Sequence, residues 1–409
     1  MLISFYKISI LAITLSEAVY GWYGVINVPI ADLLADAAHL ENPEVHPERY
    51  YTTLAPEAIP QESNKRVHQA LYNDIVNVKY TIGHESLVIL ENTYYVFSAF
   101  SKKPSINQFW TLSKNITPLS PYWIKILPIP YSKNNIILTN PWTEPSTQIT
   151  FSAGTRFARA AEYDTKDCFA IHIPDWNYLL TSSYQTPTIS FVPRQLARID
   201  AVASTDQARR SFISLIYEWI TTAQPSIVPY VWGGNSLMFT YPDYDLFINK
   251  GNNCLVDGCW SRYGQPTPLP GLDCSGLIYL AARIVGLPFF YRTTTTLSRN
   301  LSPLSFDDSL QEGDLVWFPG HVMIVGNIDR HEIIESRGYS SGFGKVHIIT
   351  LNKIFKGVSN YKQLIERFYE NRPLELLDAW GNVKKTVSQF KILKLTKHNL
   401  LRDDAYSVS

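Results

Sequence analysis

The sequence lacks an excess of charge of either sign, because 36 lysine and arginine residues balance 36 aspartate and glutamate residues. This balance argues against a protein that binds nucleic acid through bulk positive charge. After the N-terminal segment, no apolar stretch approaches the roughly 20 residues that a membrane-spanning helix needs, so we expect no stable membrane span. Charged residues make up only 18% of the chain, whereas aromatic residues reach 13% and prolines number 25. The composition therefore indicates a globular protein rich in strands and loops.

Cysteine is also scarce. The chain has too few cysteines for a disulfide scaffold, and they are Cys168, Cys254, Cys259 and Cys274. Cys254 and Cys259 bracket an Asp-Gly pair in "CLVDGC" and could close a local disulfide in an oxidising compartment, or remain free thiols. A zinc site needs two further ligands at a suitable spacing, and none lies nearby in the sequence. We therefore expect no metal.

The pattern of the chain changes twice. Residues 1–18 combine a lysine, an apolar run and the small residues of "SEA", which is typical of a cleaved signal peptide. The chain then shows short β-type runs broken by proline, asparagine and serine, the pattern of small β-barrels, until an amphipathic helix pattern begins near residue 204. We predict five segments: 1–18, a signal peptide; 19–130 and 131–200, two small all-β domains; 201–350, a domain that mixes helix and strand; and 351–409, an extension packed on that domain.

One short stretch, "GLDCSGLIYLAARIVGLP", contains a candidate nucleophile. Leu277 and Ile284 share a helical face, and Gly286 follows as a helix stop signal. Cys274 therefore lies in the first turn of a buried helix. Unpaired backbone N–H groups and the helix dipole at that end favour a thiolate over a thiol. A lone buried cysteine more often fills a gap in the core, so a catalytic role depends on a base elsewhere in the chain.

The candidate base lies in "HVMIVGNIDRHEIIES", which predicts two strands joined by a tight turn. If the hairpin is symmetric about Ile328, His321 stands directly opposite Glu335, with Cβ atoms about 5 Å apart. A slip of one residue would place the two side chains on opposite faces. A cysteine at a helix start, with a histidine held by a carboxylate, is the arrangement of a nucleophile, its base and the group that orients the base. The sequence therefore predicts Cys274, His321 and Glu335 as a catalytic set.

Four motifs in this part of the chain resemble those of the NlpC/P60 cysteine peptidases, in that family's order. They are "PYVWGG" (229–234), "LDCSG" (272–276), "EGDLVWF" (312–318) and "GHVMIVG" (320–326). The β-rich front resembles the paired bacterial SH3 domains that precede the catalytic domain of γ-D-glutamyl-L-diamino-acid endopeptidases. The resemblance implies an α+β fold class. A papain-like catalytic domain over 201–350, with the cysteine on a helix and the histidine on an antiparallel sheet, would follow two small SH3-like barrels.

The resemblance also implies roles for single residues. Carried over residue by residue, it makes Cys274 the nucleophile and His321 the base, and its third polar position falls on Glu335. It places four further residues near the oxyanion or the substrate, namely Tyr230, Trp232, Asp273 and Ser275. Helix capping is the alternative role for Asp273 and Ser275. The implied chemistry needs no cofactor and no metal.

The function implied by the resemblance is hydrolysis of peptidoglycan. We expect an exported monomer, periplasmic or associated with the cell envelope, that cuts stem peptides or muropeptides between D-Glu and meso-diaminopimelate or Lys. One alternative is a non-catalytic wall-binding protein whose SH3-like domains do the binding. The other is an amidase or acyltransferase that uses the same three residues on another amide or ester.

The sequence departs from the family pattern at two places. The segment 235–271, which includes "CLVDGC", stands where the family usually has a short turn, and it could cap or narrow the cleft. After the helix, Arg292-Thr293-Thr294 stands where related endopeptidases often show Arg-Asp-Ser. An acidic residue there would help to bind the free amine of a stem peptide. Because Thr293 stands in its place, the sequence leaves open whether the protein prefers stem peptides with a free amine.

Overall fold

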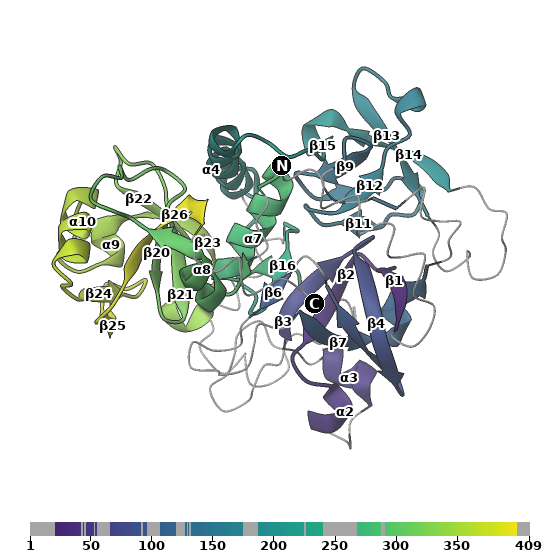
Figure 1. Ribbon diagram of the computed structural model, residues 1–409, viewed down its shortest axis with the longest axis horizontal. Coiled ribbons are helices and arrows are strands. Elements are labelled where there is room, and N and C mark those ends of the chain that lie inside the picture. Colours follow the sequence, from purple (N-terminus) through teal and green to yellow (C-terminus); the bar gives the residue numbers. More distant parts are fainter. Residues whose placement is uncertain are drawn as a thin grey trace.

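The computed structural model describes residues 21–398, apart from 42–43, 45, 53, 55–65, 91–92, 96–106, 120–126, 129, 131, 175–186, 225, 240–267 and 288–290. The expected signal peptide and the expected disulfide between Cys254 and Cys259 lie outside the described residues. Three groups of elements follow one another along the chain, coloured purple, teal, and green to yellow in Figure 1. Helices α4 (Thr205–Thr222) and α7 (Cys274–Val285) lie between the first two groups and the sheet of the third.

The first group is a seven-stranded antiparallel sheet with the strand order β3-β2-β7-β5-β4-β1-β8. Many of its β-branched and aromatic residues, such as Val25, Val78 and Phe109, are fully buried, which favours strands in these segments. Strand β3 lies at one edge of this sheet. The elements are β1 (Trp22–Ile26), β2 (Ile30–Leu34), α2 (Ala38–Glu41), α3 (Pro47–Thr52), β3 (Arg66–Leu71), β4 (Ile75–Ile82), β5 (Glu85–Ile89), β7 (Gln108–Leu112), η1 (Ser113–Asn115) and β8 (Ile116–Pro118).

The second group is built from small sheets of two or three strands around an aromatic core. The rings of Phe151 and Phe157 meet edge to face at 5.2 Å, and Trp142 stacks on Phe151 at 6.0 Å. Such a core holds strands that are too short to be stable alone. The elements are β9 (Asn135–Leu138), β10 (Trp142–Thr143), β11 (Thr150–Phe151), β12 (Arg156–Ala158), η3 (Ala161–Tyr163), β13 (Cys168–Ile173), β14 (Thr188–Pro193), η4 (Arg194–Leu196) and β15 (Ala197–Ile199).

The third group is a six-stranded antiparallel sheet in the order β19-β26-β20-β21-β22-β23, with α4 and α7 on one face. Helix α7 ends at Gly286, whose φ of 78° is left-handed and whose Cβ position lies 2.2 Å from the Ala201 carbonyl oxygen, so only glycine fits there. The sheet strands are β19 (Leu301–Pro303), β20 (Leu315–Phe318), β21 (His321–Val325), β22 (Glu332–Arg337), β23 (Lys345–Thr350) and β26 (Lys391–His398).

The remaining elements of the third group connect and cover this sheet. They are β16 (Asn235–Ser236), β17 (Gly271–Leu272), β18 (Tyr291–Arg292), α8 (Thr294–Asn300), η7 (Tyr339–Ser341), α9 (Leu351–Ile354), α10 (Tyr361–Tyr369), β24 (Leu374–Leu377) and β25 (Val383–Val387). Strand β18 pairs in parallel with β6 (Tyr94–Tyr95), so the chain of the first group reaches the third.

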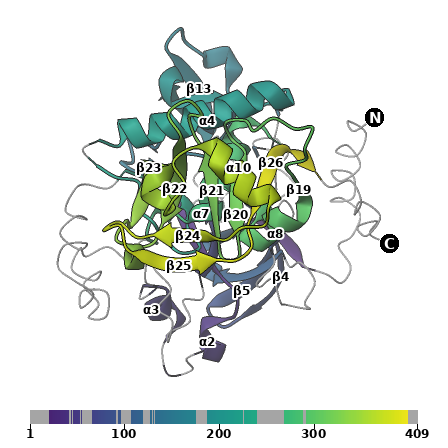
Figure 2. The same ribbon diagram turned by 90° about the vertical axis from the view of Figure 1, so that its left-hand side faces the viewer.

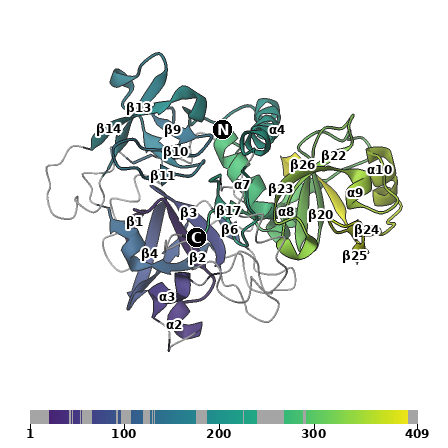
Figure 3. The ribbon, with the colours of Figure 1, turned by 180° about the vertical axis from the view of Figure 1, so that it is seen from behind.

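The two faces of the six-stranded sheet carry separate cores. Val322 and Ile334 pack with α4 and α7, whereas Met323 and Ile333 pack under α9, α10 and β24. Figures 2 and 3 show the C-terminal elements on one side of the sheet and α4 and α7 on the other. The segment after residue 350, expected to be packed on the catalytic domain, also supplies β26, which pairs with both β19 and β20. The architecture is the mixed α+β type that the sequence predicts.

Candidate active site

Cys274 is the first residue of α7, as the helix pattern predicts. Asp273 caps the helix, because its Oδ1 accepts the Gly276 N–H at 2.6 Å and its Oδ2 accepts the Gly233 N–H at 3.0 Å. A Cβ on Gly276 would meet the Gly234 carbonyl oxygen at 2.0 Å, so the "DCSG" turn needs glycine where the "GG" loop approaches it. The two motifs therefore form one tight support around a partly buried thiol.

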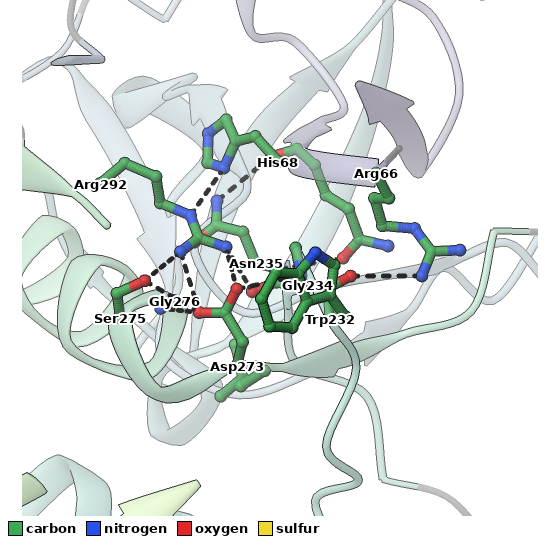
Figure 4. Close-up of polar contacts among 12 residues, drawn as sticks. Arg66, His68, Trp232, Gly234, Asn235, Asp273, Ser275, Gly276 and Arg292 are labelled. Atoms are coloured by element: carbon green, nitrogen blue, oxygen red, sulfur yellow. Dashed lines mark hydrogen bonds and ion pairs between the residues drawn. The ribbon is translucent and has the colours of Figure 1, made fainter. Parts of the chain in front are cut away.

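Arg292 holds Asp273 and Ser275, the residues on both sides of Cys274 (Figure 4). Its guanidinium is 1% exposed and donates to Asp273 Oδ1 at 2.9 Å and to Asp273 Oδ2 at 2.7 Å. It also donates to Ser275 Oγ and, at 3.2 Å, to the Gly234 carbonyl. Ser275 in turn donates to Asp273 Oδ1 at 3.0 Å. Asp273 is thus the helix cap, and Ser275 is bound to Asp273 and Arg292, while contact with substrate stays a prediction for both residues.

The thiol itself differs from expectation. Burial and then the negative charge of Asp273 raise the pKa of Cys274 to about 12, against the lowering effects of the Val322 N–H and Arg292. The Ser275 N–H at the helix start does lower this pKa, as expected, but burial and the charge of Asp273 outweigh it in the free protein. The larger cause is burial, which disfavours the charged thiolate, and the capping carboxylate of Asp273 adds a like charge beside the sulfur.

His321 and Glu335 are in direct contact. His321 Nε2 lies 2.8 Å from Glu335 Oε2, and the Glu335 side chain is fully buried. Burial alone would raise the pKa of the carboxyl, but the contacts with His321 and His347 hold it well below its usual range. The hairpin register pairs Ile324 with Ile334, which is two residues away from the predicted register. His321 and Glu335 are therefore diagonal neighbours on one face and not direct partners, and the prediction was wrong in that detail.

A second histidine, absent from the sequence prediction, lies at the other oxygen of Glu335. His347 is the cross-strand partner of Glu335 in β23, and its Nε2 lies 3.2 Å from Oε1. Arg337 Nη1 lies 3.6 Å from the same oxygen. The His347 ring stacks on Phe343 at 4.2 Å, with its Nδ1 3.2 Å from the Lys345 carbonyl. Oε1 of Glu335 thus faces His347 and Arg337, while Oε2 contacts His321. Alternation in "KVHIIT" places His347 on this face, but no local signal names its partner.

Cys274 lies close to the beginning of β21, the strand that carries His321. The backbone N–H of Val322, the residue after His321, is close enough to the Cys274 sulfur to lower its pKa. Among the hydrogen bonds of the described residues, none joins the thiol to the imidazole. Catalytic hydrogen bonds in ligand-free enzymes are often long and tighten when substrate binds. The structure thus brings all three predicted residues to one end of α7, with one contact of the set already formed.

Solved structures share this architecture. A protein of the NlpC/P60 family from Bacillus cereus matches with a TM-score of 0.50 and 16% sequence identity, over 81% of this chain and 94% of that chain. The fold is that of an NlpC/P60 protein. An NlpC/P60 endopeptidase from Photobacterium damselae subsp. piscicida matches with a TM-score of 0.47 and 12% identity, over 92% of this chain and 74% of that chain. No family model and no curated protein sequence matches the chain.

The match confirms the predicted α+β fold class and the resemblance to the NlpC/P60 family at the level of fold. It covers the β-rich front as well as the six-stranded sheet, since 81% of the chain is aligned.

The other two predicted residues, Tyr230 and Trp232, lie in the loop 229–234, whose Gly233 N–H donates to Asp273. Tyr230 is buried, with its ring edge-on to Tyr339 at 6.4 Å and its N–H bound to the Gly344 carbonyl. Trp232 is 40% exposed, and its carbonyl accepts from Arg66 Nη1 at 3.4 Å. Of the two, only Trp232 offers a large open surface, so contact with substrate stays a prediction for both.

Strand β3 of the first group lies against the same loop. Gln69 Oε1 accepts the Asn235 N–H at 3.0 Å and the Ser236 hydroxyl at 2.8 Å, while its Nε2 donates to the Leu269 carbonyl at 2.8 Å. Gln69 is fully buried. The contact between the two groups is therefore a buried polar interface and not a loose linker. Sequence reasoning missed it, because β3 and the loop are far apart in the chain.

The structure also bears on metals and membranes. Within the described ranges, no three or more His, Cys, Asp or Glu side chains are arranged to hold a metal ion. No helix in the same ranges is long and apolar enough to cross a bilayer.

Proposed function

We propose that the chain is a cysteine endopeptidase that hydrolyses peptidoglycan stem peptides or muropeptides at the γ-D-glutamyl bond to meso-diaminopimelate or Lys. The observation that carries this proposal is the His321–Glu335 pair at 2.8 Å on the strand that meets the start of α7, where Cys274 lies. The NlpC/P60 fold and the four sequence motifs support the substrate class. An exported protein, periplasmic or at the cell envelope, with the signal peptide removed before Val19, belongs to the same proposal.

The geometry supports a general-base mechanism. Glu335 holds Nε2 of His321, so Nδ1 is the nitrogen left to take the thiol proton. Because the pKa of the Cys274 thiol is about 12, the sulfur is protonated in the free enzyme at neutral pH. The proton therefore moves to His321 as the sulfur attacks the amide carbonyl. Backbone N–H groups at the start of α7, with Tyr230, would stabilise the oxyanion. The amine leaves with the proton from His321.

The second half of the reaction releases the acyl group. Water attacks the thioester on Cys274, and His321 accepts the proton of that water. The thiolate then leaves and takes a proton back, which restores the free enzyme and yields a carboxylic acid. All these steps use only the chain and water.

Mass spectrometry of defined muropeptides after incubation tests the proposal. The wild type should yield one fragment ending in D-Glu and a second beginning with the diamino acid. Cys274→Ala should yield neither, while retaining its far-ultraviolet circular dichroism and its binding to isolated cell walls.

The other outcomes name the competing functions. Wall binding without hydrolysis by the wild type would leave a non-catalytic wall-binding protein. Release of an acyl group or amine from a different bond, lost in Cys274→Ala, would show an amidase or acyltransferase that uses the same site.

A further inference from the structure

Arg292 is a buried cation whose five N–H donors are all engaged (Figure 4). Four of them reach Asp273, Ser275 and the Gly234 carbonyl around the nucleophile. The fifth, on Nε, donates to Nδ1 of His68 at 3.1 Å. Arg292 is 1% exposed, so an N–H left without an acceptor there would cost free energy. The acceptor for Nε therefore decides whether all five donors of Arg292 are satisfied in this orientation.

The acceptor comes from a different part of the chain. His68 lies in β3 of the first sheet, 224 residues before Arg292, and it is 2% exposed. Its ring also stands edge-on to Tyr279 of α7, with centroids 5.4 Å apart. Nδ1 can accept only when the ring is neutral and carries its proton on Nε2. Burial, followed by the charges of Arg292 and Arg283, lowers the pKa of His68 well below its usual value, which keeps Nδ1 an acceptor.

We propose that His68 is a positioning residue for the nucleophile. By accepting the last N–H of Arg292, it fixes the guanidinium that holds the residues on both sides of Cys274. The first sheet is then a working part of the active site and not only a unit that binds cell wall. The inference rests on the proposed role of Cys274 as nucleophile and on no assumption about which amide bond is cut.

Two variants with the same branched side-chain skeleton isolate the acceptor. In His68→Asn, the amide oxygen stands where Nδ1 was and can still accept from Arg292. In His68→Leu, that N–H stays buried without a partner. We expect kcat of His68→Leu to fall by about tenfold to a hundredfold with KM little changed, since small misplacements of reacting groups cost that much. We expect His68→Asn to remain within about threefold of the wild type.

A second readout is independent of the substrate. The rate of alkylation of Cys274 by iodoacetamide at one fixed pH, followed by peptide mass spectrometry, should fall in His68→Leu and be restored in His68→Asn. The reason is that Arg292 lowers the pKa of the thiol while Asp273 raises it, so a displaced guanidinium leaves less thiolate. His39→Asn is the control, because His39 is a hydrogen-bonded histidine of α2 in the first group, and it contacts Glu85 of β5 at 2.7 Å. It should leave alkylation at the wild-type rate.

The outcomes separate this inference from the proposed function. Equal kcat and equal alkylation in the wild type and His68→Leu would overturn the inference, whatever the substrate. Loss of alkylation in His68→Leu with rescue in His68→Asn, in a protein that cuts no stem peptide, would uphold the inference and refute the proposed function. If His68→Leu fails to fold, His68→Gln replaces it, because its oxygen falls nearer the Nε2 position. Equal behaviour of the Gln and Asn variants would then overturn the inference.

Discussion

Glu335 lies between two histidines, with His321 Nε2 at 2.8 Å from one carboxylate oxygen and His347 Nε2 at 3.2 Å from the other. Glu335→Gln keeps an oxygen that can accept from His321 and an amide that can face His347, but it removes the charge that stabilises an imidazolium. Glu335→Ala removes both. We expect activity to rank wild type, Gln, then Ala, with the Ala variant about 10³- to 10⁴-fold below wild type and KM little altered. Hydrolysis of a defined muropeptide under steady-state conditions measures this order.

Glu332 on the same strand is the matched control. Its carboxylate accepts from the Tyr217 hydroxyl at 2.6 Å and pairs with Arg330 at 3.2 Å, on the face of the strand away from His321. Glu332→Ala should lose some stability and keep its activity. A dead Glu332→Ala beside a normal Glu335→Ala would contradict the assignment of the third catalytic position.

The raised pKa of Cys274 makes a prediction with a definite sign. A thiol whose pKa is about 12, above the reference value of 9.0, has less thiolate at neutral pH than an ordinary cysteine. Its alkylation by iodoacetamide should therefore rise by about tenfold per pH unit between pH 7 and 10, without a plateau. Peptide mass spectrometry assigns the labelled site, and Cys274→Ala removes the signal. A plateau near pH 7 would show a thiolate already formed in the free enzyme.

At the scale of elements, α7 and the β21–β22 hairpin could be predicted because their signals are local. Helical spacing places Cys274 in the first turn, and strand alternation places His321 and Glu335 on one face. The predicted register was wrong by two residues, but it still placed His321 and Glu335 on the same face, since side chains alternate with a period of two. The pattern could not predict that His321 and Glu335 are diagonal neighbours, because this offset depends on where the two strands end.

Strand β26 shows the opposite case. The alternation in "KILKL" predicts a strand, but nothing local states that it lies between β19 and β20. That place depends on contacts with residues about 80 positions away, which include the ion pair of Lys394 with Asp314 at 2.6 Å. The same limit applies to His68 and His347, whose partners lie on other strands or in another sheet. Pairings of this kind follow from the folded topology and not from spacing.

The Lys394–Asp314 pair yields a prediction for this element. Lys394 is 3% exposed and Asp314 is 1% exposed, so Lys394→Met would leave a carboxylate buried without its cation. Breaking such a pair from one side costs about 3–5 kcal/mol, which urea unfolding should detect. Lys397→Met is the control, since Lys397 pairs with Asp308 at the surface and is 54% exposed. Similar loss of stability in both variants would show that β26 does not depend on the buried pair.

For the whole molecule, the buried contacts between the first sheet and the third group indicate one cooperative unit. Gln69 binds the Asn235–Ser236 strand, and Arg283 of α7 pairs with Asp74 of the first sheet. Buried polar groups of this kind are costly to leave unmatched, so separation of the sheets would expose or orphan several of them at once. Domain boundaries near residues 130, 200 and 350 stay predictions about sequence units, which need not be units of unfolding.

Calorimetry of the full chain tests this cooperativity. We expect a single unfolding transition whose calorimetric and van't Hoff enthalpies agree. Gln69→Leu should lower its midpoint by several degrees, because it strips partners from the buried Asn235 N–H, the Ser236 hydroxyl and the Leu269 carbonyl, each worth about 1–3 kcal/mol when left unsatisfied. Gln108→Leu, at an exposed position of the same sheet, is the matched control and should leave the midpoint almost unchanged. Two separate transitions in the wild type would show that the first sheet unfolds independently, and Arg292 could then lose its His68 partner while the six-stranded sheet stays folded.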